Sequence, residues 1–172
     1  MENEPSPETP RLPVQDDLVR LCRELNAHSA RYMVVGGFAV IQHGFLRATE
    51  DIDLLLESSL ENQAKVKKAL EILPDKAIRE LGEEDLRNYV VVRVADDVIV
   101  DLMLAACGIG YEEACQHVEV VTIQDVPIPF ASPKLLLRMK QTYREKDELD
   151  RKFLEQKIRT SRANNPPIRG KE

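Results

Sequence analysis

The sequence predicts an α/β (α+β) fold in which a mixed β-sheet is flanked by helices. Two kinds of pattern support this prediction. Apolar runs rich in β-branched or leucine residues, typical of strands, occur at residues 32–35, 52–56 and 98–104. Leucines repeat at helical spacing in residues 13–30 and again after Pro133. Since 172 residues are enough to bury one core, we expect a single domain.

Composition and charge exclude several classes of protein. Apolar residues make up 43% of the chain and charged residues 31%, as in an ordinary globular protein. The net charge of −6 supplies no general attraction to nucleic acid or to an anionic membrane, so RNA binding would require a local basic patch. There is no run of 18 apolar residues, and the acidic, proline-rich start does not have the pattern of a signal peptide. We therefore expect a cytoplasmic protein without membrane association.

Local signals delimit the elements of the first half of the chain. The first 13 residues bury too little to order themselves, so we expect a disordered tail. The pair Gly36-Gly37 stops the first strand, and Pro74 stops a helix that begins after a serine N-cap. The expected elements are a tail (1–13), a helix (13–30), a strand (32–35), a short helix (38–43), a strand opening at Asp51 and a helix (58–73).

The second half begins with a hairpin pattern. Two apolar runs flank Asp96-Asp97, which we interpret as turn residues without a further function. Prolines interrupt residues 126–130, which favours an edge strand or an extended segment. Ser132-Pro133 is typical of a helix start. The expected elements are a hairpin (89–104), a strand (118–123), the extended segment (126–130), a last helix in one or two pieces, and a disordered tail (158–172), so that the domain spans 14–157.

Asp51 and Asp53 are the first candidates for chemistry. Residues two apart in a strand share a face, so both carboxylates are expected to point the same way. Two adjacent carboxylates repel each other unless a cation lies between them, and hard cations such as magnesium take oxygen ligands. The alternative is that they are turn acids in front of a buried strand. Asp101 is a third carboxylate inside an apolar strand, which requires a metal or an ion-pair partner such as an arginine.

The glycine pair adds a second chemical signal. Gly36-Gly37 leads directly into a helix N-terminus, where backbone N–H groups favour anions. A phosphate-bearing donor together with a metal is the chemistry that this stretch suggests. His43, by contrast, is expected to lie at the end of the short helix rather than to bind a metal.

Val35-Gly36-Gly37 followed by Asp51-Ile52-Asp53 resembles the signature of the nucleotidyltransferase superfamily, whose fold is that of DNA polymerase beta. Together with His43-Gly44, Arg47 and Thr49, the stretch is most similar to the minimal bacterial and archaeal branch. That branch includes toxin-type (AbiEii-like) nucleotidyltransferases of toxin–antitoxin pairs. The resemblance is strong in this motif, weaker at the Asp101 strand and loose in the last helix.

The resemblance implies a reaction and a metal site. A nucleoside monophosphate would pass from a nucleoside triphosphate (NTP), such as ATP, to a hydroxyl group with release of pyrophosphate. Asp51, Asp53 and Asp101 would hold two magnesium ions, and Asp101 would accept the proton of the attacking hydroxyl. Gly36 and Gly37 would let the backbone approach the triphosphate. Many relatives carry serine at the second glycine position, so Gly37 can contribute only its backbone.

The resemblance also implies roles for four other residues. Arg47, Thr49, Lys140 and Arg144 are the candidates for contacts with the triphosphate or an RNA acceptor. Lys140 and Arg144 are four residues apart, so we expect them to share a helix face. The alternative is a solvated amphipathic helix in which both pair with acidic side chains.

The sequence does not identify the acceptor or the partners. A tRNA, a protein side chain and a small molecule such as an antibiotic are all compatible with the motif, and the toxin-type branch favours tRNA or protein. An antitoxin or toxin partner, or a homodimer, would supply acceptor selection that a single small domain lacks. The rival interpretation is a catalytically weak nucleotide-binding or toxin–antitoxin interaction protein on the same fold.

Overall fold

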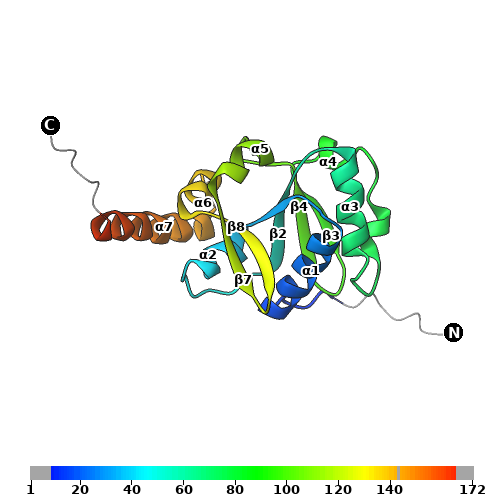
Figure 1. Cartoon of the computed structure of the whole chain (residues 1–172), viewed down its shortest axis with the longest axis horizontal. Coiled ribbons are helices and arrows are strands. Elements are labelled where there is room, and N and C mark those ends of the chain that lie inside the picture. The colour runs from blue at the N-terminus through cyan, green and yellow to red at the C-terminus, as the bar shows by residue number, and fades with distance from the viewer. Residues whose placement is uncertain (1–8, 143, 166–172) are drawn as a thin grey trace.

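The computed structural model describes residues 9–142 and 144–165, so residues 1–8 of the first predicted tail and 166–172 of the second lie outside the described residues. A six-stranded sheet with the order β3-β4-β2-β1-β8-β7 forms its centre (Figure 1). The strands of this sheet are β1 (Tyr32–Val35), β2 (Asp51–Leu56), β3 (Val92–Ala95), β4 (Ile99–Met103), β7 (Val118–Ile123) and β8 (Val126–Ala131), and β5 (Ala105–Ala106) and β6 (Ile109–Gly110) form a separate pair.

Helices flank this sheet, as the sequence predicts. Helix α1 packs against α3 and β8, whereas α2 packs against β1, β2 and α6. Helix α7 contacts α6 and projects from the rest of the chain (Figure 1). The helices are α1 (Gln15–Ala27), α2 (Gly36–Gln42), α3 (Leu60–Leu70), α4 (Asp85–Asn88), α5 (Tyr111–Ala114), α6 (Pro133–Met139) and α7 (Glu145–Asn164), with two 3-10 turns, η1 (Ala77–Glu80) and η2 (Cys115–His117).

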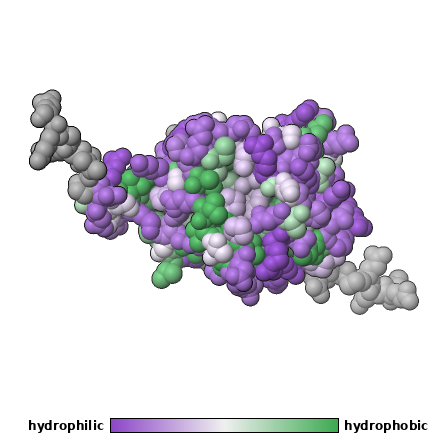
Figure 2. Space-filling view, viewed as in Figure 1, coloured by the Kyte–Doolittle hydropathy of each residue, from purple (hydrophilic) through white to green (hydrophobic). Residues whose placement is uncertain are grey.

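The sheet is mixed, which confirms the predicted fold class. Strand β2 is antiparallel to β1 and parallel to β4, and β8 is parallel to β1 and antiparallel to β7. The core lies between the sheet and the helices, and its large, fully buried side chains include Leu18, Leu25, Met33, Leu54, Leu102 and Phe130. Figure 2 shows that the surface of one face is mostly hydrophilic, with hydrophobic side chains gathered in patches. Among the described residues, no helix combines the length and the apolar character that a membrane crossing requires.

Several element boundaries differ from the prediction, and three of them are informative. Helix α2 begins at Gly36 and not two residues later. Gly36 has φ 66°, a backbone conformation that glycine adopts readily, and it leads directly from β1 into the helix. Strand β3 begins at Val92 because the last pair of the hairpin is Val92 with Leu102, and residues 89–91 are exposed. Helix α7 continues to Asn164, past the point where the tail was expected to begin.

Strand β8 is an interior strand, so the expectation of an edge position is wrong. Its prolines, Pro127 and Pro129, are paired with residues of β7. Strand β1 meets β8 in the one register pair Val34 with Phe130, which lies beyond both prolines. The carbonyl oxygen of Pro127 accepts a hydrogen bond from the Asn26 side chain at 2.9 Å. The prolines are therefore tolerated where β8 faces no continuous ladder on the β1 side.

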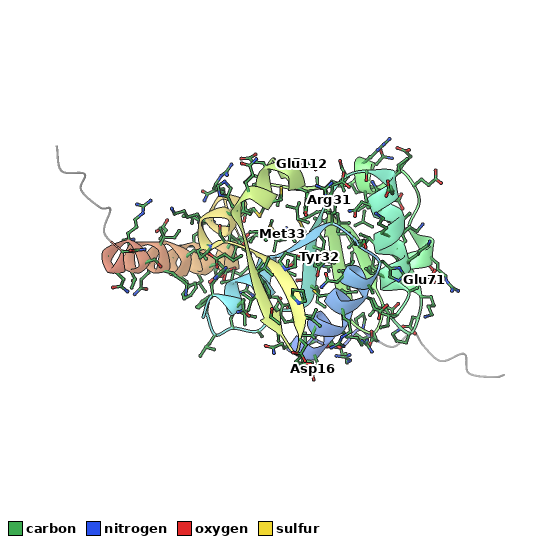
Figure 3. All side chains as sticks on the ribbon, in the orientation of Figure 1. Asp16, Arg31, Tyr32, Met33, Glu71 and Glu112 are labelled. Carbon is green, nitrogen blue, oxygen red and sulfur yellow. The ribbon has the colours of Figure 1, made fainter. Side chains whose placement is uncertain are left out.

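The two ends of β1 have different surroundings. At its start, Arg31 pairs with Glu112 of α5 at 3.4 Å, and its guanidinium lies 5.3 Å from the ring centroid of Tyr111. Figure 3 labels Arg31, Tyr32 and Glu112 at this end. The opposite end of β1 leads into Gly36 and the acidic residues of β2, and it is there that the candidate site lies.

Asp96 has a structural role that the sequence does not reveal. Its carboxylate accepts hydrogen bonds from the backbone N–H groups of Asp75, Ala77 and Asp97 at 2.9 to 3.0 Å, and its side chain is buried. The segment between α3 and η1 is thereby fixed to the hairpin turn.

Candidate active site

Two neighbouring parallel strands place three carboxylates together. Asp51 and Asp53 lie on the same face of β2, and Asp53 is the register partner of Asp101 on β4. One carboxylate oxygen from each of the three lies within 4.8 Å of the others. The parallel pairing thus brings together the three acids that the sequence singles out, and such a set of oxygens has the composition of a magnesium site.

The glycine turn lies directly against these acids. Val35 pairs with Asp53, and Gly36 follows it. A Cβ atom on Gly36 would lie 2.1 Å from Oδ2 of Asp53, so no larger residue fits while Asp53 keeps its position. A Cβ atom on Gly37 would lie 2.4 Å from the Thr49 hydroxyl oxygen. The Thr49 hydroxyl donates to the backbone oxygen of Asp51 at 3.1 Å, so Thr49 fixes the start of β2.

The pKa of Asp53 reflects the negative charge of the cluster. Burial, together with the negative charges of Asp51 and Asp101, raises the pKa of Asp53 to about 7, and a hydrogen bond with Asp51 acts in the same direction. The nearby Lys140 ammonium group acts in the opposite direction. Asp53 is therefore partly protonated at neutral pH, and a divalent cation at this place would displace its proton.

Arg93 is a site residue that sequence reasoning missed. Its Nε and Nη2 atoms donate to the two carboxylate oxygens of Asp101 at 2.9 and 2.8 Å, and Nη2 also donates to Asp51 at 3.2 Å. The pairing raises the pKa of the guanidinium, whose side chain is 56% exposed. The two-residue turn expected at Asp96-Asp97 would place Arg93 opposite Val100, whereas the observed loop over residues 96–98 places it opposite Asp101.

Arg47 and Lys140 meet at one buried carboxylate. The Nε and Nη2 atoms of Arg47 donate to Asp150 at 2.9 Å each, and the Lys140 ammonium lies 3.1 Å from the same carboxylate. Lys140 also contacts Asp147 at 3.2 Å. Both cations thus pair with acids of α7, and for Lys140 this is the pairing that the alternative interpretation gives. The charge of Lys140 also lowers the pKa of Asp53, and Arg47 lies against Gly37.

The expectation that Lys140 and Arg144 share a helix face is wrong. Lys140 is the C-cap of α6, and Arg144 is the N-cap residue of α7, so the helix is interrupted between them. Arg151 stabilises the interruption by donating to the backbone oxygens of Lys140 and Thr142, and the Thr142 hydroxyl donates to Asp147. Arg151 thereby satisfies two backbone oxygens that a continuous helix would pair internally. Arg144 is exposed at the start of α7.

His43 lies at the end of α2, as predicted. It is the C-cap residue of that helix, and its side chain is buried. Its Nε2 atom lies 2.9 Å from the backbone oxygen of Ala131 in β8. The imidazole ring therefore joins α2 to the end of β8.

A pH dependence of stability follows from Asp53. Its pKa is higher in the folded protein than in the unfolded chain, so the unfolded chain loses this proton first as the pH rises. The metal-free protein is therefore expected to lose stability from this group between about pH 4 and pH 7. Asp53→Asn should leave the melting temperature unchanged near pH 4 and raise it by about 8 to 16 °C at pH 8, because a difference of about three pKa units corresponds to ~4 kcal/mol. Thermal denaturation in the presence of a chelator measures this, and an equal gain at both pH values would contradict it.

Comparisons with known proteins bear on the fold. No protein-family model and no curated protein matches the sequence. Solved structures do match: the lincomycin-bound lincosamide antibiotic adenylyltransferase LnuA aligns with a TM-score of 0.55 and 17% identity over 84% of this chain and 98% of that chain. The antibiotic-resistance factor ANT(2'')-Ia aligns with a TM-score of 0.49 and 14% identity over 88% of this chain and 92% of that chain. The likeness to LnuA shows that this chain has the fold of a nucleotidyltransferase, which confirms the predicted fold.

Proposed function

We propose that the protein is a magnesium-dependent nucleotidyltransferase, which transfers a nucleoside monophosphate from an NTP to a hydroxyl group and releases pyrophosphate. One observation carries the proposal. Three carboxylates from two parallel strands converge beside a glycine turn that opens a helix, in a chain with the fold of an adenylyltransferase. The resemblance of the sequence motif to nucleotidyltransferases is an independent support.

Asp51, Asp53 and Asp101 are the residues that would hold magnesium. Their oxygens are hard ligands that lie within 4.8 Å of one another. The raised pKa of Asp53 indicates that the cluster lacks the positive charge that would keep all three carboxylates ionised. Bound magnesium would supply neutralisation of the triphosphate and a lower pKa for the attacking hydroxyl.

The residues of the chain have separate tasks in this reaction. The hydroxyl oxygen of the acceptor attacks the α-phosphorus, and the bond to the bridging oxygen of the β-phosphate breaks. Asp101 accepts the proton of the hydroxyl. A carboxylate has about four lone-pair positions, and Arg93 uses two of those on Asp101. The backbone at Gly36 and Gly37 approaches the phosphates, and Lys140 and Arg47 offset their negative charge.

Three classes of acceptor agree with this site. A small hydroxylated molecule is supported by the likeness to LnuA, whose description names a lincosamide antibiotic. A tRNA or a protein is supported by the resemblance of the motif to the toxin-type branch, whose members belong to toxin–antitoxin pairs. A partner protein or a second copy of the chain would then help to select the acceptor.

One observation favours a second candidate function, a nucleotide-binding or interaction protein with weak catalysis. Arg93 joins Asp101 to Asp51, so a positive charge already lies between two of the three acids. A metal bound by Asp51 would have to displace this contact. Because Arg93 is more than half exposed, its side chain has room to move away, and we favour the enzyme.

Calorimetric titration with ATP, GTP, CTP and UTP, with and without magnesium, tests the proposal. The native protein is expected to bind at least one nucleotide only when magnesium is present, and Asp51→Ala/Asp53→Ala is expected to lose that binding. Pyrophosphate release should then appear when the acceptor classes are added one at a time. If the native protein binds no nucleotide, the enzyme proposal is wrong. Binding without pyrophosphate release for any acceptor class would favour the second candidate.

A further inference from the structure

Asp150 joins two cations: Arg47, which lies beside the glycine turn, and Lys140, whose charge acts on Asp53. Its side chain is fully buried, whereas the side chains of Arg47 and Lys140 remain 20% and 11% exposed. Arg47 lies 103 residues earlier, in the loop between α2 and β2, and Lys140 ends α6. The Asp150 carboxylate is thus the common point of three segments that are distant in sequence.

The contacts of Asp150 determine where Arg47 points. The Nη2 atom of Arg47 donates to Oδ2 of Asp150 at 2.9 Å, and the same atom lies 3.2 Å from the position of a Cβ atom on Gly37. The guanidinium is therefore held against the turn where the phosphates are proposed to bind. Two parallel hydrogen bonds to one carboxylate fix its orientation as well as its position.

Lys140 is held in a comparable way. Its ammonium lies 3.1 Å from Asp150 and 3.2 Å from Asp147, and its positive charge lowers the pKa of Asp53. An ammonium has three N–H donors, so two acidic partners leave one donor for a ligand. Long cationic side chains lose about 2 kcal/mol of rotamer entropy when they are fixed, and a buried acid that fixes them beforehand removes part of that cost from ligand binding.

We propose that Asp150 is a positioning residue for the NTP, which orients Arg47 and Lys140 toward the triphosphate and makes α7 part of the nucleotide site. This inference rests on the proposed function. It assigns Asp150 no contact with the nucleotide. The competing explanation is that the four charges only attach α7 to the rest of the protein, in which case Asp150 affects stability and not nucleotide affinity.

Asp150→Asn separates the two explanations, since it keeps the size of the side chain and removes the charge. We expect the dissociation constant for the magnesium–NTP complex to rise about tenfold to a hundredfold. The dissociation constant for inorganic tripolyphosphate, measured without metal, should rise as well. Asp96→Asn is the matched control, because Asp96 is an equally buried acid that binds only backbone N–H groups. It should lower the melting temperature and leave both dissociation constants unchanged.

The measured affinities for NTP and for tripolyphosphate distinguish three outcomes. Affinities of Asp150→Asn equal to those of the native protein would overturn the positioning role and leave the proposed function intact. A native protein that binds no NTP but binds tripolyphosphate, with an affinity that Asp150→Asn lowers, would refute the proposed function and support the positioning role. A native protein that binds neither would overturn both.

A second variant covers the case in which Asp150→Asn does not fold. Arg47→Lys keeps a positive charge near Gly37 and cannot form the two parallel hydrogen bonds to Asp150. The proposal expects weaker binding of magnesium–NTP and of tripolyphosphate by this variant. Unchanged affinities would overturn it, since orientation by Asp150 would then be irrelevant.

Discussion

Gly36→Ala is expected to abolish binding of magnesium–NTP and to lower the free energy of unfolding by about 1 to 3 kcal/mol. The backbone cost arises because Gly36 has φ 66°, where a Cβ atom is unfavourable. The added Cβ atom would also lie 2.1 Å from Oδ2 and 2.6 Å from Cγ of Asp53. If Asp53 rotates away, the collision is relieved and the cluster of three acids is broken. Thermal denaturation and calorimetric titration measure the two effects.

Gly108→Ala is the matched control for this variant. Gly108 has φ 77°, and no atom lies within 4 Å of the position of its Cβ atom. It should therefore show the backbone cost of about 1 kcal/mol without any loss of nucleotide affinity. Full magnesium–NTP affinity in Gly36→Ala would show that the turn tolerates a side chain and does not approach the phosphates.

Asp101→Asn is expected to reduce the rate of pyrophosphate release by about 10²- to 10⁴-fold, the usual contribution of a general base. An asparagine side chain keeps the size and one acceptor oxygen, and it neither accepts the proton nor carries the charge of a metal ligand. Single-turnover pyrophosphate release, with the acceptor that gives turnover in the native protein, measures the change.

Arg93→Gln serves as the comparison for Asp101→Asn. It breaks the ion pair from the other side and leaves all three carboxylates in place. Magnesium-dependent nucleotide binding should survive in this variant. Native turnover by Asp101→Asn would instead mean that Asp101 serves only to pair with Arg93, which is the structural alternative for a buried acid in a strand.

The parts of the site that follow from strand periodicity were predictable from the sequence. Asp51 and Asp53 share a face because strand side chains alternate, and the glycine pair marks the turn that precedes them. The position of Asp101 depends on β2 and β4 being neighbours, which local patterns do not specify. For Asp101, the resemblance to a known family supplied the expected position beside Asp51 and Asp53, which strand periodicity alone does not give.

Other features depend on long-range contacts that no local pattern records. Arg47 and Asp150 meet across 103 residues, and neither residue type is unusual in its own segment. The prolines of β8 suggested an edge because a proline lacks the N–H group of a ladder, but the opposite side of that strand carries no continuous ladder. Asp96 resembles any turn acid, and its burial appears only once the segment after α3 is placed against it.

The position of Asp150, late in the sequence, has a consequence for the protein during its synthesis. The glycine turn and the three acids are all translated by residue 101, whereas the carboxylate that holds Arg47 and Lys140 follows some fifty residues later. A nascent chain that ends before α7 therefore carries the acids without the anchor for the two cations. If the nucleotide site needs that anchor, a chain interrupted on the ribosome before residue 145 would bind the nucleotide more weakly than the finished chain, and full activity would require synthesis past α7.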